Sequence, residues 1–65
     1  MQQVIYLEVE DDLPAIRDLL EGAQARKVLL VVPKGSTVFR EPINLRVLRR
    51  YAANLALDVG LVTRD

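Results

Sequence analysis

The stretch Val28-Leu29-Leu30-Val31-Val32 decides the fold of this 65-residue chain, because it is five apolar residues with no polar residue between them. A strand with one solvent-exposed face would alternate apolar and polar residues. An unbroken aliphatic run is instead typical of a strand in a parallel sheet that is covered on both faces. Pro33-Lys34-Gly35-Ser36 ends the run sharply. The sequence therefore predicts a buried strand over residues 28–32.

Upstream of this strand, the sequence predicts a strand over residues 4–9 and a helix over about 13–24. VIYLEV is rich in β-branched and aromatic residues, which favour strands. Asp11 or Asp12 is a natural N-cap, and Pro14 falls in the first turn, where its missing N–H costs little. Gly22 weakens or ends the last turn. The expected buried stripe, at three- and four-residue steps, is Leu13, Ile16, Leu19, Leu20 and Ala23.

Downstream, we expect a loop over 35–41, a helix over about 42–56 and a strand over 59–63. Asn44 is placed to hydrogen-bond the preceding loop. The expected buried stripe of this helix is Leu45, Leu48, Ala52 and Leu55, widened by Val47 and Tyr51.

This alternation predicts an α/β fold, β-α-β-α-β, with a small three-stranded parallel sheet and right-handed crossovers. The chain looks like half of a larger α/β fold, so we expect residues 1–65 to be a single domain or the N-terminal part of one. The apolar run at 28–32 favours its own strand as the centre of the sheet. The order 2-1-3 is slightly preferred, because it gives each sheet face one helix.

The composition excludes several kinds of chemistry. The chain has neither cysteine nor histidine, so it lacks the thiolate and imidazole groups that most often act as nucleophiles, general bases and zinc ligands. Ser36, Thr37 and Thr63 have no histidine to activate them, and we predict no enzyme activity, no metal and no cofactor. No apolar run is long enough to span a membrane, and the start does not resemble a signal peptide, so we expect a cytoplasmic location.

The charges are balanced overall but unevenly placed. Residues 1–25 hold six of the nine acidic residues and one basic residue, whereas residues 26–65 hold eight of the nine lysines and arginines. Such asymmetry can mark an interaction surface. A nucleic-acid-binding domain usually has a basic excess, which this chain lacks, so no nucleic acid partner is expected.

The loop after the second predicted strand is a candidate anion site, formed by Lys34, Gly35, Ser36 and Thr37. Backbone N–H groups at such a junction can bind phosphate, and Gly35 allows a close approach. The spacing does not match a P-loop. A loop of this composition more commonly just leads into a helix.

Two charged clusters are weaker candidates. Carboxylates near the end of the first strand would bind Mg²⁺ only if Asp65 joined them from the third, and N-capping explains them more simply. A basic row on the second helix suggests an interaction surface for an acidic partner, although a solvated helix face is the commoner role. The acidic cluster is Glu8, Glu10, Asp11 and Asp12; the basic row is Arg46, Arg49 and Arg50, with Arg40 nearby.

The segments VVPKGS (31–36), NLRVLRR (44–50) and LVTRD (61–65) resemble the N-terminal soluble domain of a family of bacterial proteins that are commonly labelled as membrane proteins of unknown function. Arg46 and Val47 stand where the family more often has lysine and leucine. The resemblance covers nearly the whole chain and implies a cytoplasmic Rossmann-like or flavodoxin-like domain on a longer protein, with the membrane segment elsewhere. It implies no activity.

The sequence thus predicts a non-catalytic interaction or scaffold domain that binds a protein partner or self-associates, with no membrane span of its own. One alternative is a nucleotide- or phosphate-binding module built on the Lys34–Thr37 loop. Another is a domain resembling anti-sigma-factor antagonists, with Ser36 as the phosphorylated residue, although the acidic-serine-serine-glycine motif of that family is missing.

Overall fold

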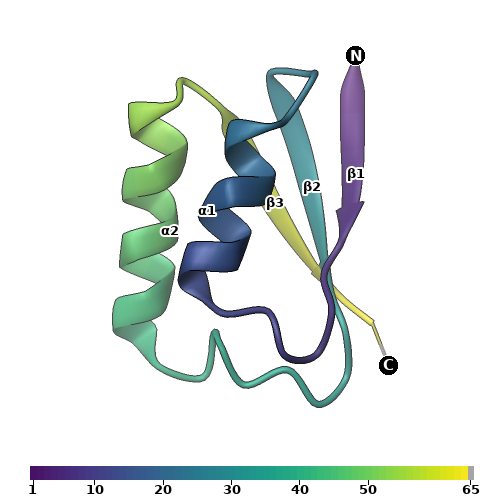
Figure 1. Ribbon diagram of the computed structural model, residues 1–65, viewed down its shortest axis with the longest axis vertical. Coiled ribbons are helices and arrows are strands. Elements are labelled where there is room, and N and C mark those ends of the chain that lie inside the picture. Colours follow the sequence, from purple (N-terminus) through teal and green to yellow (C-terminus); the bar gives the residue numbers. More distant parts are fainter. Residues whose placement is uncertain (65) are drawn as a thin grey trace.

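The computed structural model describes residues 1–64, in which strands and helices alternate (Figure 1). All three strands are parallel and form one sheet, which confirms the predicted α/β fold. The elements are β1 (Gln2–Tyr6), α1 (Leu13–Glu21), β2 (Lys27–Val32), α2 (Pro42–Asn54) and β3 (Asp58–Thr63).

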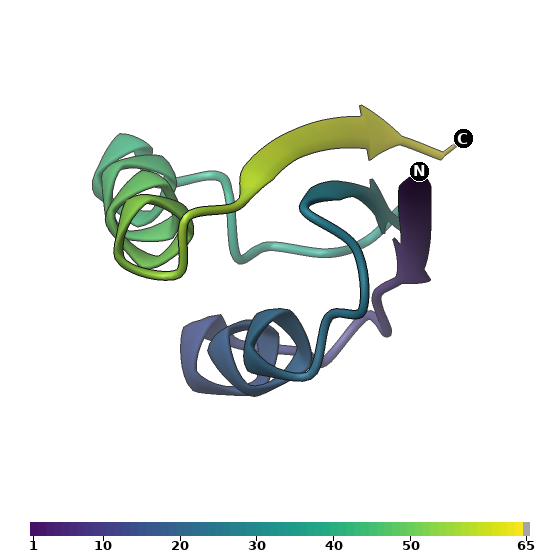
Figure 2. The same ribbon diagram turned by 90° about the horizontal axis from the view of Figure 1, so that it is seen from above.

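The strand order is β1-β2-β3, so the slight preference for the order 2-1-3 is wrong. The apolar strand β2 is central, as its composition favoured. Both crossovers step across the sheet in the same direction, and right-handed crossovers of this kind put both helices on the same face. Figure 2 shows α1 and α2 on one side of the sheet, and the two helices also pack against each other. No helix within residues 1–64 lies on the other face.

The core lies between the sheet and the two helices. Alternate residues of β2, namely Val28, Leu30 and Val32, are buried against the helices, together with Ile16 and Leu20 of α1. Leu7 and Leu48 complete the buried cluster. The intervening residues of β2 point to the helix-free face and are only half-buried, so the prediction of a strand covered on both faces is wrong.

Helix α1 is capped as expected but is shorter. The Asp12 side chain accepts a hydrogen bond from the Ala15 N–H (3.1 Å), which makes Asp12 the N-cap. The helix ends at Glu21, because Gly22 is the C-cap and the chain then turns toward β2. Leu19, expected in the buried stripe, is 39% exposed.

Helix α2 begins at Pro42, as predicted, and ends at Asn54. Its N-cap residue, Glu41, makes no side-chain capping bond. The Asn44 amide donates a hydrogen bond to the Val38 carbonyl, which confirms its expected role in holding the preceding loop. That loop packs Val38 and Phe39 against the core.

Within the described residues, neither helix has the length and apolar character needed to cross a lipid bilayer.

Candidate functional site

The helix-free face of the sheet carries an apolar patch. In the parallel register, Val4 pairs with Leu29, and Tyr6 pairs with Val31, which in turn pairs with Val62. Register partners in a sheet point to the same face, so these five side chains form one patch, which we call the open-face patch. Val4 and Val62 are each 42% exposed and Tyr6 is 66% exposed. The patch spans all three strands.

Charged residues flank this patch at the amino ends of the strands. Lys27 of β2 and Asp58 of β3 are register partners, and both are exposed. Their side chains point to the same face of the sheet as the open-face patch, because residues separated by an even number in a strand share a face. Lys27 precedes Leu29 by two residues, and Asp58 precedes Val62 by four. The open face therefore combines an apolar centre with one positive and one negative side chain.

A hollow of about 280 Å³ lies at the carboxyl ends of β2 and β3, and we call it the basic hollow after its charged lining residues. Lys34, Arg40 and Arg64 contribute to its lining, while Val32 and Phe39 give it an apolar side. The position fits the general tendency of ligands to bind outside the carboxyl ends of parallel strands.

The structure divides the predicted anion loop between two sites. Lys34, Gly35 and Ser36 line the basic hollow, whereas Thr37 lines a separate depression beside Asp11 and Asp12. The turn itself is fixed, because Gly35 has a φ of +93° and the Ser36 N–H bonds the Pro33 carbonyl at 3.2 Å. Arg64 belongs to the hollow but was missed as a site residue. Its place directly after a strand, at the edge where Lys34 also lies, was the available signal.

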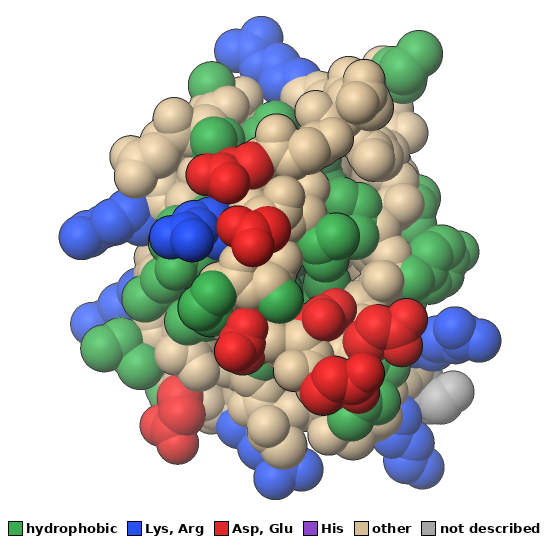
Figure 3. Space-filling view, viewed as in Figure 1, with side chains coloured by type: hydrophobic (Ala, Val, Ile, Leu, Met, Phe, Trp, Pro, Cys, Tyr) green, Lys and Arg blue, Asp and Glu red, His purple; other side chains and the backbone are tan. Residues whose placement is uncertain are grey.

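Two of the acidic residues after β1, Asp11 and Asp12, accept hydrogen bonds from the backbone. Asp11 accepts a hydrogen bond from the Glu8 N–H (2.8 Å), and Asp12 caps α1. In residues 1–64, no three acidic side chains gather as a metal site would require. Asp65 lies outside the described residues, and β2 separates β1 from β3, the strand that Asp65 follows. Figure 3 shows the acidic side chains spread over the face formed by α1 and the loop before it.

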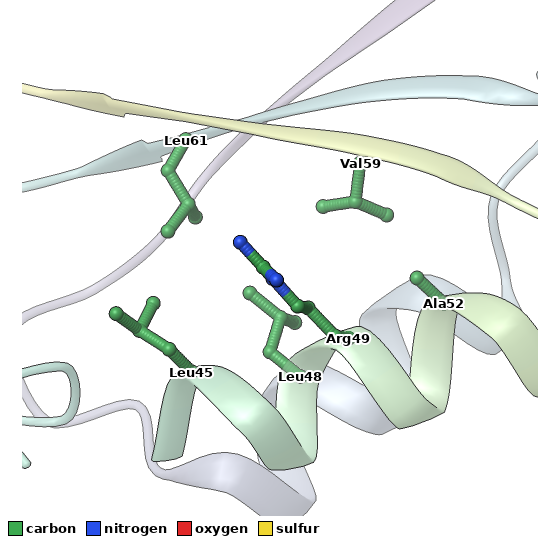
Figure 4. A pocket seen from close by; sticks show the side chains of 6 residues that line it. All are labelled: Leu45, Leu48, Arg49, Ala52, Val59 and Leu61. Atoms are coloured by element: carbon green, nitrogen blue, oxygen red, sulfur yellow. The ribbon is translucent and has the colours of Figure 1, made fainter. Parts of the chain in front are cut away.

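All three arginines of the predicted basic row of α2 are exposed, but Arg49 alone of them lines a groove. Arg49 lies in a groove of about 340 Å³ between α2 and β3, with Leu45 and Leu61 among its neighbours. Figure 4 shows its guanidinium group extending between these apolar side chains. Arg46 and Arg50 are exposed and take no part in this groove.

Comparisons with protein-family models, curated proteins and solved structures find no match to this chain.

Proposed function

We propose that this chain is a non-catalytic interaction domain that pairs with a second copy of itself through the open face of its sheet. The observation that carries the proposal is the open-face patch, which crosses all three strands and has no helix over it. Apolar patches of this kind on small proteins commonly mark interaction surfaces. Covering it would bury the second side of β2, whose sequence has the composition of a strand buried on both sides.

A second copy is the partner that the charges favour. The chain has no net charge, so two copies do not repel each other at long range. Two sheets stack face to face about 10 Å apart. A two-fold axis that runs along the strands, midway between β2 and β3, places Lys27 of each copy over Asp58 of the other. The same axis places Leu29 over Gly60, a large side chain opposite a position that has none.

The resemblance to bacterial proteins that are labelled as membrane proteins suggests where in the cell this dimer would form. In such a protein the domain would lie on the cytoplasmic side and bring two copies of the longer chain together. A phosphorylation switch at Ser36 is not favoured, because its Oγ atom is buried.

Sedimentation over a concentration series tests the proposal. We expect a folded dimer that dissociates on dilution, and we expect Val62→Lys to give a folded monomer. Ile43→Lys is the matched control, since Ile43 on α2 is 63% exposed but lies away from the open face. A wild-type chain that stays monomeric at all concentrations, or a dimer that Val62→Lys leaves intact, contradicts the proposal.

The proposed register has its own test. Lys27→Asp and Asp58→Lys each put like charges over one another in a homodimer, so each variant alone should dissociate. A mixture of the two should form heterodimers, because the opposite charges then face each other. Arg50→Asp and Asp18→Lys are the controls, since these variants carry the same net charges but alter residues outside the open face, so each alone should still form homodimers. If each control variant dissociates as Lys27→Asp and Asp58→Lys do, or if mixing Lys27→Asp with Asp58→Lys does not restore the dimer, the register is wrong.

A further inference from the structure

We propose that the basic hollow binds a phosphomonoester dianion through Lys34, Arg40 and Arg64. None of the residues that line this site belongs to the open-face patch, but the site adjoins the proposed dimer surface, because Arg64 follows Val62 by two residues. It is an inference about a ligand, whereas the proposed function concerns a second copy of the chain.

The charge of the hollow indicates an anion. All three of its charged lining residues are basic, and no aspartate or glutamate among residues 1–64 lines it. Within those residues the only ion pair joins Arg17 to Asp18, on α1. These three cations repel one another, only weakly because all three are exposed to solvent, and an anion between them would replace this repulsion with attraction. Arginine binds phosphate oxygens in pairs, which suits phosphate better than a single-point anion.

The backbone holds the basic residues in place. The Arg64 N–H donates to the Val32 carbonyl (2.8 Å), which extends the ladder between β2 and β3 past the end of the strand. The Arg40 N–H donates to the Thr37 carbonyl (3.1 Å), and the Gly35 turn fixes the backbone next to Lys34. Binding therefore needs little ordering beyond that of the side chains and a small movement of the turn over residues 33–36, which keeps its entropic cost low.

Ser36 supplies an independent observation. Its Oγ atom is buried and has no hydrogen-bond partner among the described residues, although Ser36 contributes to the wall of the hollow. A buried hydroxyl without a partner destabilises the fold. A bound phosphate would give it an acceptor after a small movement of the turn over residues 33–36. A ligand in the hollow would thus account for the orphan hydroxyl.

The size and walls of the hollow narrow the ligand class. Its volume is near the lower end of typical ligand pockets, which are roughly 300–1,000 Å³. Phe39 and Val32 offer apolar surface beside the cations, so a phosphate ester with a small organic group should bind more tightly than inorganic phosphate.

Amide chemical-shift titrations of the whole chain test the site, with phenyl phosphate and inorganic phosphate as probes at constant ionic strength. We expect saturable shifts at Gly35, Ser36 and Arg64 with a Kd of about 1 mM for phenyl phosphate, and weaker binding of inorganic phosphate. Binding should weaken between about pH 7.5 and pH 5, because the second proton of a phosphate monoester binds with a pKa of about 6. Benzenesulfonate, a monoanion of similar shape, should bind at least about fivefold more weakly than phenyl phosphate.

Variants separate the site from general charge effects. Arg40→Gln and Arg64→Gln should each weaken binding by about tenfold, whereas Arg46→Gln and Arg50→Gln should leave it unchanged. Ser36→Ala should weaken binding without lowering the unfolding temperature, because its hydroxyl has no bond to lose in the free protein. Lys27→Asp, which should dissociate the dimer and lies at the opposite end of β2, should retain binding, so failure of the dimer does not remove the site. The absence of saturable shifts up to about 20 mM, or equal effects of the Arg46 and Arg64 variants, overturns the proposal.

Discussion

Gly60 of β3 lies beside Leu29 of β2 in the parallel register, and a Cβ atom on Gly60 would stand 3.2 Å from Leu29 Cδ1. The missing side chain at position 60 therefore gives the Leu29 side chain room on the open face. The contact is tight but involves the flexible end of a half-buried leucine, which can move outward because no helix covers this face.

Gly60→Ala should therefore affect folding and self-association differently. Leu29 yields by a few tenths of an ångström, and the alanine reduces the entropy of the unfolded chain, so the free energy of unfolding should change by less than about 1 kcal/mol. The new methyl group occupies the position that faces Leu29 of the second copy, so the dimer should weaken. Denaturant titration of the dilute monomer and sedimentation measure the two effects. A dimer that tightens would contradict the proposed register.

Gly35→Ala should destabilise the chain by about 1–2 kcal/mol, because a φ of +93° is strained for alanine. Gly22→Ala is the matched control. Gly22 has a φ of −89°, and the nearest atoms to an added Cβ are 3.7 Å away, so alanine there should be neutral or slightly stabilising. Denaturant unfolding of the three chains gives the comparison. Equal stabilities of the two variants would show that the Gly35 conformation is not retained in solution.

Leu30→Ala should remove most of the stability of the fold, whereas Leu29→Ala should not. Leu30 is fully buried under the helices, and truncating such a leucine costs roughly 2–5 kcal/mol, against a total of roughly 3–10 kcal/mol for a chain of this size. Leu29 points to the open face, so Leu29→Ala should lower the free energy of unfolding of the monomer by only about 1 kcal/mol. Circular dichroism during denaturation of dilute samples measures both. Similar losses would mean that the open face is covered.

Substitutions at the N-caps of α1 and α2 should change the free energy of unfolding in opposite directions. Asp12→Ala removes the bond to the Ala15 N–H and should cost about 1 kcal/mol. Glu41→Ser should add about 0.5–1 kcal/mol, because Glu41 now makes no capping bond and serine is a preferred N-cap. Unfolding temperatures check both changes. A Glu41→Ser chain no more stable than the wild type would show that the extended backbone at position 41 does not bring a cap within reach.

Local signals in the sequence were enough to predict the elements and their order. Asp12, Pro14 and the break at Pro33 mark boundaries through short-range chemistry, and the structure has them where the sequence places them. Strand order depends on the direction of the second crossover, which no single residue encodes. The preference for 2-1-3 assumed that each face of the sheet has a helix. In residues 1–64, both helices lie on the same face.

The candidate site was predictable only where it depends on local sequence. The turn at Lys34–Ser36 follows from local composition, and the structure retains it at the hollow. Thr37 turns away because the chain reverses after Ser36 toward α1, and Arg64 joins because β3 lies next to β2. Both outcomes depend on the tertiary arrangement and not on neighbours in the sequence.

Asn44→Ala tests whether the loop before α2 is held by a single side chain. The Asn44 amide donates to the partly buried Val38 carbonyl, so its loss should cost about 1–2 kcal/mol and leave that carbonyl without a partner. Asn44→Asp should cost at least as much, because a carboxylate cannot donate to a carbonyl. Asn54→Ala, at the exposed end of α2, is the control and should cost less than about 0.5 kcal/mol.

The same change should also affect the basic hollow, since Phe39 and Arg40 follow Val38 directly and both line it. We expect Asn44→Ala to weaken phenyl phosphate binding about two- to threefold under conditions where the chain remains folded. Denaturant unfolding and the amide titration measure the two effects on the same samples. If the Asn44 and Asn54 variants have equal stability and equal affinity, the loop is held by the packing of Val38 and Phe39 on the core alone.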